Sequence, residues 1–217
     1  MSLKVIRPVI NFEKGRGHNN CQLIVYHCTG YPANTAEGIF RWFNNPASEK
    51  SSHDLILPNG DLWELVNTKD TSWGAGIVGM KNGIPDPPKN QIARKWWEKG
   101  GRINQIVHNI EILVVENKNP TEEQYKTAIE RGKEIAKIWS IPIDSEHFCG
   151  HRDIRSDKLC PGLVSVPRII IEANKPMLTD TPKVNNLTSQ QKQSILNLLI
   201  AFIVDSAIIE RIKKLFQ

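Results

Sequence analysis

Two apolar patterns in the first 45 residues predict a strand and then a helix. Residues 22–28 are apolar and rich in β-branched side chains, which predicts a buried strand that ends at His27 and Cys28. Residues 35–45 place large apolar side chains at helical spacing, so we expect a helix with one buried face. That face comprises Ile39, Phe40, Trp42 and Phe43.

Two short apolar runs, 52–57 and 61–66, flank the turn sequence Pro58-Asn59-Gly60. This arrangement predicts a β-hairpin, because these residue types favour the backbone angles of a tight turn. His53 lies near its start. Residues 74–106 are rich in Gly, Pro, Lys and Trp and predict a long loop with one short helix over 91–98.

The strongest strand signal, 106–115, is apolar enough for a central position but carries Glu111 in its middle. Burying a carboxylate is costly unless the group is paired or takes part in chemistry. A structural ion pair or an edge position is the alternative explanation for Glu111.

A long helix is predicted from Pro120 to about Ser140, with acidic residues in its first turn. A short strand over 146–149, a polar loop over 150–162 and a short helix after Val166 follow. The core-facing stripe of the long helix comprises Ala128, Ile129, Gly132, Ile135, Ala136 and Trp139.

This order of elements predicts an α/β (α+β) fold, in which helices flank a mixed central β-sheet. We expect residues 1–174 to form this domain and 175–187 to form a linker. Residues 188–217 predict a small helical segment, with Thr188 or Ser189 as a cap. This segment would pack on the domain, form a homo-oligomer, or target a wall or membrane surface.

The net charge of +5 favours an anionic partner such as a bacterial cell wall. No basic run resembles a nucleic-acid arm, so we expect no nucleic-acid partner. The N-terminus lacks the apolar core of a secretory signal, and no stretch is long enough for a transmembrane anchor. We therefore expect synthesis in the cytoplasm without a signal peptide.

Without a signal peptide, the four cysteines are poor evidence for disulfides. Cys21, Cys28 and Cys149 are predicted to be small buried hydrophobic residues. A catalytic zinc site needs three protein ligands and one open position. His27 at a strand end, with His151 and Cys160 in a loop, could supply such a set.

Five motifs in the order of one family strengthen this hypothesis, and they cover about residues 20–165. The sequence resembles the zinc-dependent N-acetylmuramoyl-L-alanine amidases of the phage-lysozyme and peptidoglycan-recognition-protein (PGRP) superfamily. The motifs are Val-Tyr-His27-Cys-Thr29, Ser-Ser-His53, Ser-Trp73-Gly-Ala-Gly, Asn109-Ile-Glu111-Ile, and Gly-His151-Arg-Asp followed by Lys158-x-Cys160-Pro-Gly.

The resemblance implies that His27, His151 and Cys160 bind Zn²⁺, and that Lys158 stabilises the reaction's oxyanion. Phage lysozymes place a tyrosine where this chain has Ser52, whereas cytosolic muropeptide amidases use a central-strand glutamate that Glu111 matches. Glu111 is therefore the expected base. Gly74 replaces a histidine that many members have.

The family also implies contacts of Trp73, His53 and Thr29 with the glycan strand and stem peptide of peptidoglycan, although His53 could instead orient a neighbour. The expected reaction cuts the amide bond between N-acetylmuramic acid and L-alanine, as in an endolysin released through a holin-type pore. A cytosolic muropeptide-recycling amidase and a non-catalytic peptidoglycan-binding module are the alternatives.

Overall fold

The computed structural model describes residues 3–17, 20–30, 35–76, 78–81, 83–175 and 188–194. The chain divides into two compact units, Met1–Asn174 and Lys175–Gln217. In the second unit, residues 189–194 are helical, and the Thr188 hydroxyl accepts a hydrogen bond from the Gln191 backbone N–H. The rest of the predicted C-terminal helices, and the linker beyond Lys175, lie outside the described residues.

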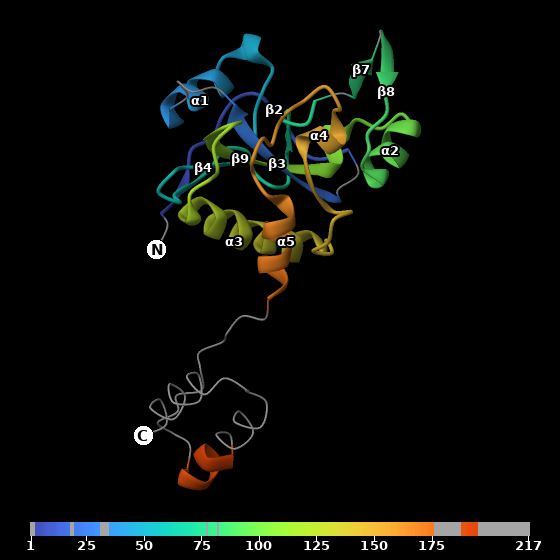
Figure 1. Ribbon diagram of the computed structural model, residues 1–217. Coiled ribbons are helices and arrows are strands. Elements are labelled where there is room, and N and C mark those ends of the chain that lie inside the picture. The colour runs from blue at the N-terminus through green and yellow to red at the C-terminus, as the bar shows by residue number, and fades with distance from the viewer. Residues whose placement is uncertain are drawn as a thin grey trace. The chain divides into compact units, whose positions relative to one another are not determined.

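A six-stranded mixed sheet forms the centre of the first unit, in the order β1-β5-β4-β9-β3-β10 (Figure 1). β4 and β5 pair antiparallel as the predicted hairpin, and the remaining pairs are parallel. The strands of this sheet are β1 (Lys4–Ile6), β3 (Leu23–Gly30), β4 (Asp54–Ile56), β5 (Leu62–Glu64), β9 (Val107–Val115) and β10 (Phe148–Gly150).

Helices cover both faces of this sheet, as the sequence predicts (Figure 1). One face packs against α3 (Glu122–Trp139) and α5 (Val166–Asn174). The other face packs against α1 (Ala36–Phe43), α2 (Gln91–Glu98) and α4 (His151–Ile154). Two 3₁₀ helices, η1 (Pro46–Ser48) and η2 (Ile103–Ile106), complete the helical elements of the described part of the first unit.

The long helix α3 shows how local sequence determines an element here. Its first turn has a capping box, in which Thr121 and Gln124 satisfy each other's backbone N–H groups. A Cβ on Gly132 would lie 2.4 Å from the Tyr26 hydroxyl, so only glycine allows α3 to approach β3 this closely. Ser140 ends the helix in the left-handed conformation.

Two predictions of loops were only partly correct: the helix predicted over 91–98 is present as α2, but short elements in both segments were missed. Residues 74–106 contain a hairpin, β7 (Gly79–Lys81) with β8 (Ile84–Asp86), and the Asn82-Gly83 sequence is a typical hairpin signal. Residues 150–162 contain α4, because the Asp153 side chain accepts a hydrogen bond from the Gly150 backbone N–H at 2.8 Å and stabilises the first turn.

A further two-stranded pair joins β2 (Phe12–Glu13) and β6 (Thr71–Ser72).

Cys21, Cys28 and Cys149 are buried, as expected, and Cys160 is buried as well. The alternative of an edge position for Glu111 is wrong, because β9 lies between β4 and β3. Among the described residues, no helix has the length and apolar character needed to cross a membrane.

Candidate metal centre

His27 lies near the carboxyl end of β3 and is buried, with 2% of its surface exposed. Its Nε2 atom lies 2.9 Å from Oδ1 of Asn109 on the neighbouring strand β9. An amide oxygen only accepts hydrogen bonds, so the His27 proton resides on Nε2. Nδ1 is therefore left with a free lone pair.

His151 is the first residue of α4 and directly follows β10, which pairs with β3. Its Nε2 atom lies 3.1 Å from the Ala75 carbonyl oxygen. A carbonyl oxygen can only accept a hydrogen bond, so the His151 proton resides on Nε2. Nδ1 of His151 is thus unprotonated as well. The two Nδ1 atoms face each other at 3.2 Å, an unfavourable pairing of lone pairs unless a cation lies between them.

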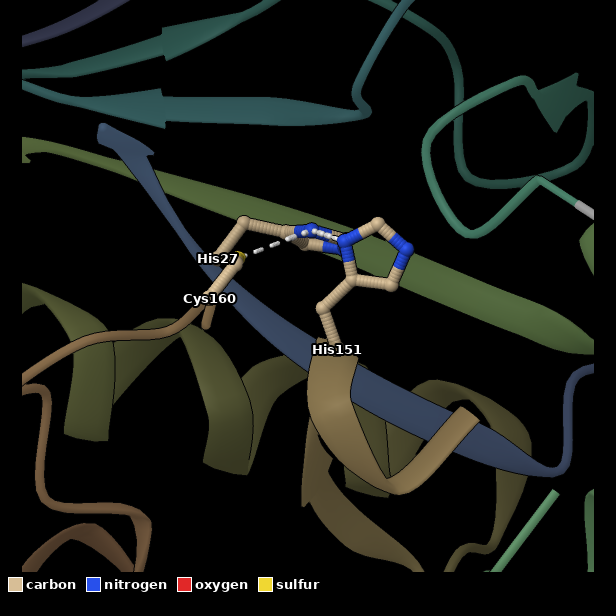
Figure 2. A group of neighbouring side chains, drawn as sticks. All are labelled: His27, His151 and Cys160. Atoms are coloured by element: carbon tan, nitrogen blue, oxygen red, sulfur yellow. Dashed lines mark hydrogen bonds between the residues drawn. The ribbon is translucent and has the colours of Figure 1, made fainter. Parts of the chain in front are cut away.

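Cys160 completes this group, with its Sγ atom 3.7 Å from Nδ1 of His27. Figure 2 shows the three side chains pointing toward one another from β3, α4 and the segment after α4. The three ligand atoms all lie within 4.8 Å of one another. The structure therefore brings together the three residues that the sequence proposed as metal ligands.

The spacing of these atoms fits a tetrahedral zinc ion. Zinc binds nitrogen at about 2.0–2.1 Å and sulfur at about 2.3 Å, which places tetrahedral nitrogens roughly 3.3 Å apart and nitrogen and sulfur about 3.6 Å apart. Nδ1 of His27 lies 3.2 Å from Nδ1 of His151 and 3.7 Å from Sγ of Cys160, and the third pair, His151 with Cys160, lies within 4.8 Å. His27, His151 and Cys160 therefore fit this metal in residue type and spacing.

Burial keeps both imidazoles in the neutral form that binds metals. It lowers the pKa of His27 to about 4. Burial and the neighbouring His27 lower the pKa of His151 to about 2. An interaction with the Cys28 side chain, burial and the charge of Glu111 raise the pKa of the Cys160 thiol, so a cation is needed to favour the thiolate.

Glu111 lies directly beside His27, because these two residues are register partners on β9 and β3. Burial raises the pKa of its carboxyl group to about 8. Its Oε2 atom is buried and has no hydrogen-bond partner among the described residues. Among the described residues no hydrogen bond accounts for this oxygen, and a buried carboxyl group with a raised pKa beside a candidate metal centre is typical of a functional site.

A cavity of about 520 Å³ opens onto the three candidate ligands. Lys158 and Thr29, two residues singled out from the sequence, line it together with Glu111. Sequence reasoning missed several other lining residues, since nothing in the sequence marks α1 as a wall of this cavity. The missed residues include Ile39, Trp42, Phe43, Lys50, Glu116 and Arg155.

The structure separates Trp73 and His53 from the wall of this cavity. Trp73 lines a second, smaller cavity of about 220 Å³ with Trp97 and Arg102, and Gly76 borders both cavities. His53 is fully buried, so its contacts fit an orienting residue and not a substrate contact. Its Nδ1 atom lies 2.8 Å from Oγ of Ser72.

Comparison with known proteins gives a match over most of this domain. The sequence model of the family described as N-acetylmuramoyl-L-alanine amidase matches residues 17–163. No curated protein matches the chain.

Solved structures with this fold are similar at low sequence identity. The amidase LysC from Clostridium intestinale URNW is 17% identical, with a TM-score of 0.56 over 80% of this chain and 99% of that one. A selenomethionine derivative of AmpD is 18% identical, with a TM-score of 0.60 over 80% and 95%. PlyL is 16% identical, with a TM-score of 0.51 over 81% and 92%.

Proposed function

The chain belongs to the N-acetylmuramoyl-L-alanine amidase family. From this we propose that the protein is a zinc-dependent enzyme. It would hydrolyse the amide bond between N-acetylmuramic acid and L-alanine in peptidoglycan. The observation that carries this proposal is the convergence of Nδ1 of His27, Nδ1 of His151 and Sγ of Cys160 at the cavity. Three ligands and one side open to solvent are typical of catalytic zinc and not of structural zinc.

Zinc held by these residues would act as a Lewis acid and lower the pKa of water in the open position. Glu111 accepts the proton of the attacking water through its unpaired Oε2 and passes it to the leaving nitrogen of L-alanine. The Lys158 ammonium, on the cavity wall, stabilises the oxyanion that develops on the carbonyl. Thr29 and the second cavity with Trp73 are the proposed contacts to substrate.

Mass spectrometry of digested peptidoglycan tests the bond that is cut. We expect the wild-type protein to release stem peptides with a free N-terminal L-alanine from intact glycan strands. Cys160→Ala should release none above background. New reducing sugar ends without free peptides would show glycosidic cleavage and overturn the proposal.

The biological role we propose is that of an endolysin that reaches the cell wall through a holin-type pore, and the cysteine at position 160 and the additional C-terminal segment of the sequence favour it. A cytosolic amidase that recycles muropeptides is the second candidate, and the glutamate at position 111 favours it. Loss of turbidity of intact sacculi, compared with cleavage of soluble muropeptides, distinguishes the two. An endolysin clears the sacculi, whereas a recycling enzyme cleaves only the soluble substrate.

A non-catalytic peptidoglycan-binding module is the alternative from another class. Such a module would bind sacculi without releasing any peptide. The complete set of three candidate ligands, with Glu111 and Lys158 beside them, supports the enzyme.

A further inference from the structure

Asn109 is a fully buried polar residue on β9 that the proposed reaction does not use directly. Its side-chain oxygen lies 2.9 Å from Nε2 of His27, and its side-chain nitrogen donates to Oγ of Ser72 at 2.8 Å. The Ser72 hydroxyl lies 2.8 Å from Nδ1 of His53. A continuous chain of hydrogen bonds therefore joins His27 to the buried His53.

His53 also holds the backbone of Asn109 in place. The Asn109 backbone N–H donates to Nδ1 of His53 at 2.9 Å, so this nitrogen is an acceptor. The Ser72 hydroxyl then donates to Nδ1 and accepts from the Asn109 amide. The side-chain amide consequently has one orientation, with its oxygen toward His27.

Gly74 provides the space that Asn109 occupies. A Cβ at position 74 would lie 2.8 Å from Cγ of Asn109 and 2.9 Å from the Ser51 carbonyl oxygen. The Asn109 side chain cannot move aside without breaking hydrogen bonds, because its backbone N–H is bonded to His53 and its side-chain amide to Ser72. A side chain at position 74 would therefore displace the amide from His27.

We propose that Asn109 is a positioning residue that holds His27 in the Nε2–H form with Nδ1 directed at the metal, and that Gly74 is required to leave room for it. The inference rests on the proposed function only for the identity of the metal. Groups that hydrogen-bond the outer nitrogen of a metal-binding histidine fix its protonation state and orientation. Asn109 does this for His27, and the Ala75 carbonyl does it for His151.

The test uses the full-length protein and two readouts other than activity. Long-range ¹H–¹⁵N correlation spectra of the metal-free protein report which His27 nitrogen carries the proton. Competition with a chromophoric chelator gives the Kd for Zn²⁺. In Asn109→Leu, which keeps the bulk but removes the acceptor, we expect a shift toward the Nδ1–H form and a 10- to 100-fold weaker Kd.

Two further variants keep the test decisive if Asn109→Leu does not fold. Gly74→Ala should weaken zinc binding by a similar factor and change the His27 spectrum, although it leaves Asn109 in the chain. Asn109→Asp keeps an acceptor oxygen and should retain the Nε2–H form with a Kd within about 3-fold of wild type.

Asn11→Leu is the matched control, because Asn11 is also a buried amide, with its side chain on Asn45 and Ser48 and away from the cavity. It should lower stability but leave the His27 spectrum and the zinc Kd unchanged. An unaltered His27 spectrum and Kd in both Asn109→Leu and Gly74→Ala would overturn the inference. Zinc binding that depends on Asn109, in a protein that releases no peptide, would reject the proposed function alone.

Discussion

His27 and Glu111 are direct register partners on two adjacent parallel strands, β3 and β9. This pairing places a candidate metal ligand and a buried carboxylate side by side on one face of the sheet. Cys160 and His151 then approach the same point from the chain segment that follows β10. The site thus combines the middle of β9, the carboxyl half of β3 and the segment that follows β10.

Removal of the sulfur ligand should abolish metal binding. We expect Cys160→Ala to purify with less than about a tenth of the wild-type zinc content, because a two-histidine site lacks the third ligand of catalytic zinc. Elemental analysis of the purified protein measures this. Cys21→Ala, which changes a buried cysteine outside the cavity, should retain full zinc. Full zinc content in Cys160→Ala would exclude this cysteine as a ligand.

Glu111→Gln should bind zinc but lose activity. The substitution keeps the shape of the side chain and removes the proton acceptor, and general-base catalysis contributes about 10²–10⁴-fold. We expect kcat for release of stem peptide to fall by about that factor, with little change in KM. A variant with more than a tenth of the wild-type kcat would show that another group accepts the proton.

In the metal-free protein, Glu111 should make stability decrease as the pH rises. Its folded-state pKa of about 8 lies above the ordinary value of 4.5, so the folded protein binds the extra proton between these values. The contribution of this group to stability is therefore greatest below pH 4.5 and declines up to pH 8. Gln at position 111 cannot ionise.

Urea unfolding of the metal-free proteins at several pH values checks this dependence. The free energy of unfolding of Glu111→Gln relative to that of the wild type should increase from pH 5 to pH 8, by an amount on the order of 3 kcal/mol. If the difference between Glu111→Gln and the wild type stays constant over this range, burial does not raise the pKa of the Glu111 carboxyl group.

Lys158→Met should reduce catalysis without affecting the metal. The ammonium group lines the cavity beside the candidate ligands and should act on charge that develops only in the transition state. Loss of one such donor typically lowers kcat by about 10²–10³-fold. Zinc content should stay at the wild-type level. Lys118→Met, at an exposed position outside the cavity, provides the control and should leave kcat unchanged.

A buried ion pair on the other face of the sheet should matter for stability alone. The Asp54 carboxylate accepts hydrogen bonds from Arg131 at 2.9 and 3.0 Å and from His108 at 2.6 Å. Asp54→Asn leaves the buried Arg131 charge without its principal partner and should cost about 3 kcal/mol in the free energy of unfolding.

The exposed pair between Glu122 and Arg168 gives the contrast to this buried pair. Glu122→Gln should cost much less of the free energy of unfolding than Asp54→Asn, because solvent screens the charges of an exposed pair. Chemical unfolding measures both values. Equal losses in the two variants would show that burial does not strengthen the Asp54 pair.

The sequence alone predicts elements whose causes are local. The β-branched run before His27, the Pro-Asn-Gly turn of the hairpin and the capped start of α3 each specify their own backbone over a few residues. The candidate zinc ligands could be named as well, because residue type and motif order identify them. The loops over 74–106 and 150–162 were only partly predicted, since short hairpins and single helical turns have weak patterns.

Only the tertiary structure decided what surrounds the metal centre. The pairing of β3 with β9 joins segments about 80 positions apart, and no local pattern encodes the register that places Glu111 and Asn109 beside His27. The same packing buries His53 completely. It also brings Gly74 so close to the Asn109 amide that a side chain at position 74 would collide with it. Residue chemistry is a property of the sequence, whereas protonation state and orientation depend on neighbours that only folding supplies.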